Sequence, residues 1–156
     1  MVSNELVDVT IARIPHRRPV LAGRDQPVGE LVDRLAASKR GSVIVIDDDG
    51  RVLGMFTERD VKHRLDFRDE SWREVLVGDV MTVDATAIHE SATFADALAL
   101  MRDRRRRHLP IVGANGRVDG VLSIRDLLRF VVRHYPDHFL NLPPGPKHET
   151  SSRWGG

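Results

Sequence analysis

RGSVIVIDDDGRVLGMFTERD, residues 40–60, aligns without a gap with RRHLPIVGANGRVDGVLSIRD, residues 106–126, at a constant offset of 66 positions. The two stretches share seven identical positions, among them Gly54 with Gly120 and Asp60 with Asp126. Self-similarity at a fixed spacing is the mark of an internal repeat. The chain of 156 residues therefore consists mainly of two similar halves, which are small enough to share one core or to build two.

Each half has the same predicted order of elements. In the first half Val28, Leu31, Val32, Leu35 and Ala36 recur at the spacing of one helical face, and a β-branched run follows. The predicted elements of this half are an extended segment 19–21, a helix from residue 27 to near 41, strands 43–46 and 52–56 around a turn, and a helix after 57. Those of the second half are an extended segment 81–83, a helix over 94–101, strands 109–112 and 118–122, and a helix over 123–134. The fold class predicted is α/β (α+β), with two pseudo-symmetric β-α-β-β-α repeats.

The division of the chain follows from this order. We predict repeat 1 at residues 12–66, a polar linker at 67–78, repeat 2 at 79–135 and a Pro/Gly-rich C-terminal tail at 136–156, whose segment 139–142 is apolar enough to dock on the domain.

Composition limits the class of protein. The formal net charge is +1, aromatic residues make up 5%, and there is no cysteine, which argues against a large field for nucleic acid and excludes disulfides and thiolate metal sites. No apolar run reaches the roughly 18 residues of a membrane helix, and the first residues do not form a signal peptide. We expect a cytoplasmic protein.

The tail of each repeat carries the candidate site. GMFTERD (54–60) and GVLSIRD (120–126) each place a hydroxyl residue, Thr57 or Ser123, at a strand-to-helix junction, and an aspartate in the first helical turn. Helix N-termini receive phosphate, and a carboxylate can accept bonds from two ribose hydroxyls. The same spacing is also that of a helix capping box, which needs no ligand. Capping and binding can coexist.

These residues resemble those of a tandem pair of CBS (cystathionine beta-synthase) domains, a Bateman module of the stand-alone bacterial type. The resemblance covers about residues 12–134 and rests on RRPVLAGRDQPVGELVDRLAASKRGSVIVIDDDGRVLGMFTERDV (17–61) and VMTVDATAIHESATFADALALMRDRRRRHLPIVGANGRVDGVLSIRDLL (80–128). It implies two repeats packed sheet to sheet, with two clefts that take AMP, ADP, ATP, NAD or S-adenosylmethionine, and assembly into homodimers. It implies a regulatory module that senses energy or redox state and signals to a partner protein, without a catalytic cofactor.

The resemblance also assigns roles to individual residues. Asp60 and Asp126 hold ribose hydroxyls, and Thr57 and Ser123 face the phosphate. The base is lined by the start of each hairpin, which the resemblance places at Ser42, Val43, His108, Leu109 and Pro110. The first repeat departs from the second at its opening, where Pro15-His16 stands in place of Met81-Thr82, so equal occupancy of both clefts is not expected.

Several arginines have more than one interpretation. Arg59 and Arg125 can reach phosphate or pair with neighbouring carboxylates. The run Arg104–Arg107 fits a solvated helix end, a phosphate contact through Arg106 or Arg107 with His108, or, less well, a nucleic-acid surface. No phosphate-loop or nucleophile motif is present in the sequence, and scattered histidines do not suggest a metal site. The alternatives to a nucleotide sensor are therefore a ligand-free dimerisation scaffold and a nucleic-acid binder.

Overall fold

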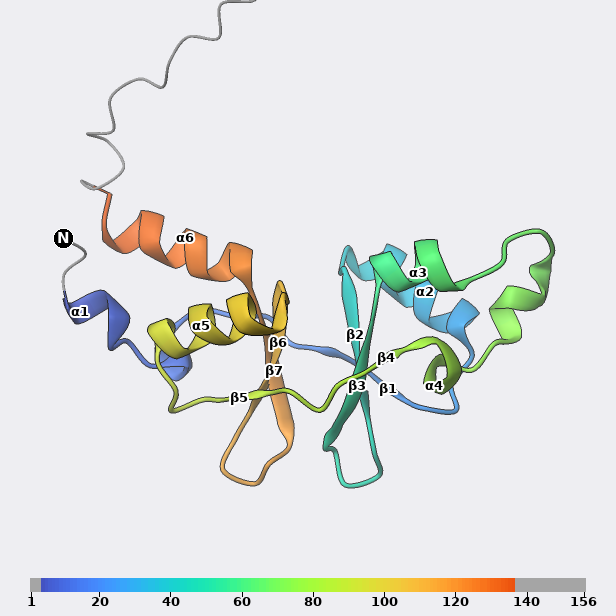
Figure 1. The fold of residues 1–156 in the computed structure, drawn as a ribbon, viewed down its shortest axis with the longest axis horizontal. Helices are drawn as coiled ribbons and strands as arrows, with labels where there is room; N and C mark the ends of the chain where they lie inside the picture. Colours follow the sequence, from blue (N-terminus) through green and yellow to red (C-terminus); the bar gives the residue numbers. More distant parts are fainter. Residues whose placement is uncertain (1–3, 137–156) are drawn as a thin grey trace, which may run out of the picture.

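The computed structural model describes residues 4–136, which form two halves that lie side by side (Figure 1). The elements of the first half are β1 (Val20–Gly23), α2 (Val28–Ser38), β2 (Ser42–Ile46), β3 (Val52–Thr57) and α3 (Glu58–Arg64). Those of the second half are β5 (Ile88–His89), α5 (Phe94–Arg104), β6 (His108–Val112), β7 (Val118–Ser123) and α6 (Ile124–His134). In each half the first strand pairs in parallel with the next, which pairs antiparallel with the third. The predicted β-α-β-β-α repeat is confirmed.

The turns and helix ends show the same offset. Helices α2 and α5 both end at a left-handed residue, Lys39 with φ of 52° and Arg105 with φ of 50°. The hairpin turns of the two halves contain Gly50 and Gly116, with φ of 80° and 73°, a region that glycine enters without steric cost. Backbone conformation therefore repeats every 66 positions, as the sequence does.

The two faces of each hairpin bury different cores. On β2, Val43 and Val45 pack toward α2, whereas Ile44 joins a cluster with Met55 and with Val121 of the other sheet. Because side chains alternate across a strand, a run that is apolar at every position predicts burial on both faces. The predicted packing of sheet on sheet is confirmed.

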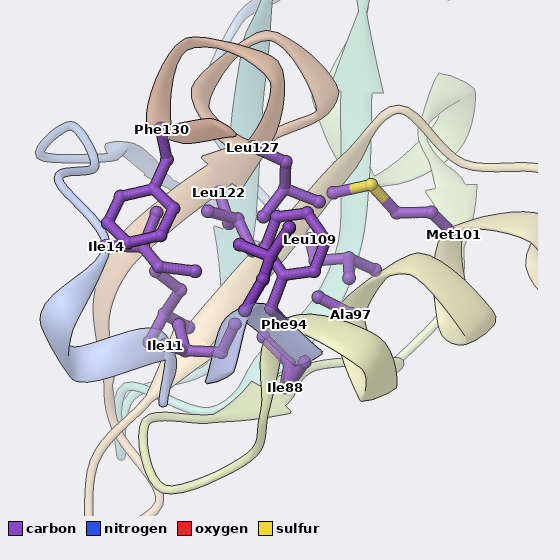
Figure 2. Packing of buried hydrophobic residues seen from close by; sticks show 12 residues of the cluster. Ile11, Ile14, Ile88, Phe94, Ala97, Met101, Leu109, Leu122, Leu127 and Phe130 are labelled. Carbon is purple, nitrogen blue, oxygen red and sulfur yellow. The ribbon is translucent and has the colours of Figure 1, made fainter. Parts of the chain in front are cut away.

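The core of the second half also includes residues from the start of the chain (Figure 2). Helix α1 (Asn4–Val7) and the 3-10 helix η1 (Ile11–Arg13) supply Leu6 and Ile11 to the cluster that contains Phe94, Leu122 and Leu127. The backbone N–H of Ile11 donates to the Ala92 carbonyl at 2.8 Å. The first described residues thus pack in the second half of the molecule, although in the sequence they precede β1, the first strand of the first half.

Two short stretches, residues 81–83 and the residues around Arg17, each pair with the sheet of the other half, and we call them the crossing segments. Strand β4 (Thr82–Val83) pairs antiparallel with β3, at the edge of the first sheet, through Gly54 with Val83. The expectation that residues 81–83 open the second sheet is therefore wrong, since β5 holds that place. Arg17, at the equivalent of Val83, bridges to Val121 of β7 in the second sheet. A segment of two residues has too little pattern to reveal which sheet it joins, and tertiary contacts decide.

The connection between the halves has structure of its own. It contains the 3-10 helix η2 (Glu70–Glu74) and the start of α4 (Val77–Val80). Val77 is fully buried in the first core, and the N–H of Val28 donates to the Val75 carbonyl at 2.8 Å. The linker is thus packed against α2.

Residues 139–142, predicted to dock, lie outside the described residues. No helix within residues 4–136 is long and apolar enough to cross a membrane.

Candidate functional site

Both predicted hydroxyl-aspartate pairs form capping arrangements. The Ser123 N–H donates to Asp126 Oδ2 at 2.9 Å, and the Ser123 hydroxyl donates to the same oxygen at 2.8 Å. At the other copy the Thr57 N–H donates to Asp60 Oδ2 at 2.8 Å. Both carboxylates are buried, at 5% exposure for Asp126 and 6% for Asp60. The predicted caps are confirmed.

A third capping box shows that capping alone does not identify a ligand site. Thr93 and Asp96 at the start of α5 make the same contacts, with the Thr93 N–H donating to Asp96 Oδ2 at 2.9 Å, yet Asp96 is exposed. A cap alone therefore marks no ligand site in this chain, and the surroundings of Asp126 and Asp60 must carry the argument.

The two strand glycines, Gly54 and Gly120, leave room for the crossing segments to pass close to the strand backbone. A Cβ at Gly54 would overlap the Thr82 carbonyl oxygen, and one at Gly120 would lie 2.5 Å from His16 Cδ2. The close approach that a strand glycine permits is thus to the chain itself at both places.

A cavity of about 420 Å³ opens where α6 begins, between the two halves. Its walls come from the N-terminal crossing segment, the end of α2, the start of β2 and β6, and the β7–α6 junction. Six of the predicted site residues line it: Ser42, Arg107, His108, Ser123, Arg125 and Asp126. We call this cavity the arginine cleft.

The arginine cleft is strongly cationic. Two carboxylates, Glu58 and Asp126, line it. Its basic side chains number seven: Arg17, Arg18, Lys39, Arg40, Arg107, Arg125 and Arg129. Within residues 4–136 only Arg129 of these forms an ion pair, with Asp126. A cleft lined with one sign of charge concentrates the field and attracts anions, although the whole chain carries only +1.

Arg40 shows an unmet hydrogen-bonding need. Its Nη1 is buried and has no hydrogen-bond partner within the described residues. Leaving such a donor unpaired costs free energy, and more for a charged group than for a neutral one. A group that accepts hydrogen bonds in the cleft would satisfy this donor.

His108 is held in its neutral form. Burial lowers the pKa of His108 below its ordinary value. The positive charges of Arg125 and Arg107 act in the same direction, and Asp126 opposes them. At neutral pH the imidazole can accept or donate one hydrogen bond at the floor of the cleft without adding charge.

The equivalent region of the other repeat is closed. Arg106 forms an ion pair with Asp84 at 2.6 Å, and both side chains are about four-fifths buried. Desolvation tends to raise the pKa of Asp84, but hydrogen bonds from Thr86 and the charges of Arg106 and Arg104 outweigh it and lower the pKa. The space beside this pair, next to Met55 and His108, leaves no room for a water molecule.

The remaining predicted residues lie outside the arginine cleft. Thr57 and Asp60 form their own cap, where Asp60 Oδ1 also accepts from the Thr82 hydroxyl at 3.2 Å, and Arg59 is exposed. Val43 and Leu109 point their side chains into the two cores, and Pro110 is buried in β6.

The run Arg104–Arg107 does not form one surface. Arg104 ends α5, Arg105 is its left-handed cap residue, Arg106 binds Asp84 and Arg107 lines the cleft.

Sequence reasoning missed most of the arginines. Arg40 was recognisable as the counterpart of Arg106 at the offset of 66. Arg17 and Arg18 reach the cleft only because their segment crosses to the second half, for which no sequence signal exists. Arg129 reaches it from α6, three residues after Asp126, a spacing that the sequence does show. Within residues 4–136 no group of three or more His, Cys, Asp or Glu side chains could hold a metal ion.

Curated relatives match the chain through part of their length. An uncharacterized 17.7 kDa protein of Acidianus ambivalens is 37% identical over 102 residues, which are 65% of this chain and 60% of that protein. Inosine-5'-monophosphate dehydrogenase of Methanocaldococcus jannaschii is 33% identical over 112 residues, 72% of this chain but 21% of the enzyme. The chain thus spans less than two thirds of these relatives, and the enzyme is matched over a fifth of its length.

Solved structures share the fold. A CBS-domain containing protein of Agrobacterium tumefaciens superposes with a TM-score of 0.67 at 31% identity, over 78% of this chain and 97% of that one. The protein CBSX2, crystallised in complex with AMP, gives a TM-score of 0.68 at 23% identity, over 80% and 97% of the two chains. The CBS domain family matches residues 11–66 and again residues 77–133. The chain therefore belongs to the CBS domain family, and it contains two copies of the domain.

Proposed function

We propose that this chain is a non-catalytic regulatory module that binds an adenosine-type nucleotide, of the AMP, ADP, ATP or NAD class, in the arginine cleft. The observation that carries the proposal is the cavity itself, because it brings a buried aspartate at a helix N-terminus together with apolar walls and with arginines that, Arg129 apart, form no ion pair among residues 4–136. Those three features match a ribose, a phosphate chain and a base.

The geometry gives each part of a nucleotide a partner. Among residues 4–136, Asp126 Oδ1 is bound only by the half-exposed Arg129 at 3.3 Å, so it retains capacity to accept bonds from ribose hydroxyls. The first N–H groups of α6 favour phosphate. Val20, Val121 and Ile124 supply apolar surface for the base.

Binding there would join the two halves. One wall contains Lys39 to Ser42 of the first repeat, and the facing wall contains Ser123 to Asp126 of the second. A ligand that prefers one relative packing of the repeats shifts their equilibrium by its difference in affinity. We propose that this shift is how the module signals to a partner protein in the cytoplasm.

The relatives support a regulatory role. Inosine-5'-monophosphate dehydrogenase is matched over 21% of its length, so the similarity concerns about a fifth of that enzyme and leaves the rest of it unmatched. CBSX2 was crystallised with AMP, but at 23% identity it supports the fold alone. The ligand class therefore rests on the cleft.

The test uses two aspartates with the same cap geometry. Thermal unfolding is followed with AMP, ADP, ATP, NAD and S-adenosylmethionine, since a ligand at 100 times its dissociation constant stabilises by about 2.7 kcal/mol. Asp126→Ala is expected to remove this stabilisation. Asp96→Ala, which loses a cap of the same kind outside the cleft, is expected to keep it. If none of the five ligands stabilises the unaltered chain, or if Asp126→Ala retains the effect, the proposal fails.

A second candidate function is dimerisation without ligand. Leu128 and Val132, four residues apart on α6, are 56% and 52% exposed, and such a stripe suits a second copy of the chain. We propose a homodimer through this face, whether or not a nucleotide binds. A nucleic-acid function has less support, because the arginine run points in separate directions.

A further inference from the structure

The two repeats carry opposite charges at one equivalent position. Arg18 in the first crossing segment corresponds, at the offset of 66, to Asp84 after the second. Arg18 lines the arginine cleft and forms no ion pair with any described residue, whereas Asp84 binds Arg106 at 2.6 Å. The pseudo-symmetry of the backbone is thus broken by charge.

The arginines at the next equivalent position show the consequence. Arg40 corresponds to Arg106. Arg106 has an internal carboxylate as its partner, and Arg40 has a buried Nη1 with no partner among the described residues. Asp84 therefore supplies on one side the negative charge that is missing on the other.

The capping aspartates Asp60 and Asp126 also differ in how many partners their second carboxylate oxygen, Oδ1, has. Asp60 Oδ1 accepts from the Thr82 hydroxyl at 3.2 Å and pairs with Arg64 at 3.3 Å. In the described part of the chain Asp126 Oδ1 accepts from Arg129 alone. His16 replaces Thr82 at the equivalent place and directs its Nδ1 to the Ile14 carbonyl instead. The carboxylate in the arginine cleft is the more available of the two.

We propose, on the basis of the proposed function, that the chain binds one nucleotide, in the arginine cleft, and that this cleft selects a nucleoside di- or triphosphate over a monophosphate. In the other repeat the Asp84–Arg106 pair takes the place of the phosphate and leaves no site. Arg18, Arg40 and Arg107 hold the phosphate chain. A monophosphate has too little charge to engage all three, since each arginine favours two acceptor oxygens.

Calorimetric titration of the whole chain with adenosine, AMP, ADP and ATP, in EDTA to remove divalent metal, tests the proposal. The expected result is one site per chain, with ATP and ADP binding on the order of tenfold or more tighter than AMP. Arg40→Gln is expected to reduce the ratio of ATP to AMP affinity to within about threefold, by weakening ATP and not AMP. The matched variant Arg106→Gln, at the equivalent position, is expected to leave the ratio unchanged. Inorganic tripolyphosphate is expected to bind more weakly than ATP, because it lacks the base and ribose.

The outcomes separate this inference from the function it rests on. If no adenosine compound binds, the proposed function itself fails. If AMP binds as tightly as ATP, if two nucleotides bind per chain, or if Arg106→Gln alters the ratio as Arg40→Gln does, the nucleotide site stands and the inference is overturned. Tripolyphosphate that binds as tightly as ATP overturns the assignment to a nucleoside phosphate.

Discussion

Replacing Gly54 with alanine tests whether the crossing segments are built as described. An added Cβ would overlap the Thr82 carbonyl oxygen and lie 3.2 Å from its carbon and 3.1 Å from Met81 Sδ. The carbonyl belongs to β4, whose ladder with β3 consists of two residue pairs, so the backbone must move or the pairing must break. Forcing such an overlap costs roughly 1–3 kcal/mol, equivalent to a fall in Tm of roughly 2–12 °C for a domain of this size.

The assay is urea unfolding followed by circular dichroism, with Gly23→Ala as the control. Gly23 ends β1, and a Cβ there meets no heavy atom within 4 Å, so its free energy of unfolding should change by less than about 0.5 kcal/mol. If Gly54→Ala is as stable as Gly23→Ala, β4 does not pass against β3 in solution, and the crossing of the segments is refuted.

Other substitutions test the core, the closed region, the cleft and the assembly. Phe56→Ala removes a fully buried ring and should cost about 3–5 kcal/mol in urea unfolding, whereas Phe67→Ala, at a half-exposed site, should cost far less; equal costs would contradict the packing. Because the pKa of Asp84 is lowered in the folded state, its contribution to stability is present above the ordinary pKa of about 3.9 and is lost as the pH falls through the folded value. Unfolding measured from pH 7 to 3 should therefore show a smaller acid loss in Asp84→Asn than in the parent chain, and equal losses would rule this out. The lowered pKa of His108 should rise when an anion enters the cleft. ATP binding near pH 6 should therefore take up more protons in the parent chain than in His108→Gln, as measured by calorimetry in buffers of different ionisation enthalpy. Equal proton uptake by the two chains would place the phosphates away from His108. Leu128→Asp should convert the proposed dimer to a monomer in sedimentation velocity, and a parent chain that already sediments as a monomer would exclude this interface.

The repeat and its elements were predictable because their causes are local. The periodicity of α2, the β-branched run of β2 and the glycine turns are each decided by neighbouring residues. The caps at Thr57 and Ser123 were predictable for the same reason, since a hydroxyl and an aspartate three positions apart satisfy the first N–H groups of a helix wherever they occur.

The crossing segments were not predictable, and the cleft takes Arg17 and Arg18 from one of them. Two residues of β4 carry no pattern that distinguishes one sheet from the other, and Arg17 joins the second sheet through a single bridge. A glycine within a strand indicates that another group approaches the backbone closely, but the sequence does not show that this group is Thr82 at Gly54 and His16 at Gly120. The offset of 66 positions also relates Arg18 to Asp84. The sequence alone, however, does not show that Arg18 lies in one cleft with Arg40, or that Asp84 pairs with Arg106.

The most direct measurement is a crystal structure of the chain with ATP. We expect one nucleotide per chain, with its ribose hydroxyls on Asp126 and its phosphates against Arg18 and Arg40, while the Asp84–Arg106 pair stays intact. A nucleotide bound beside Asp60, or an arginine cleft that stays empty at saturating ATP, would contradict the assignment of the site.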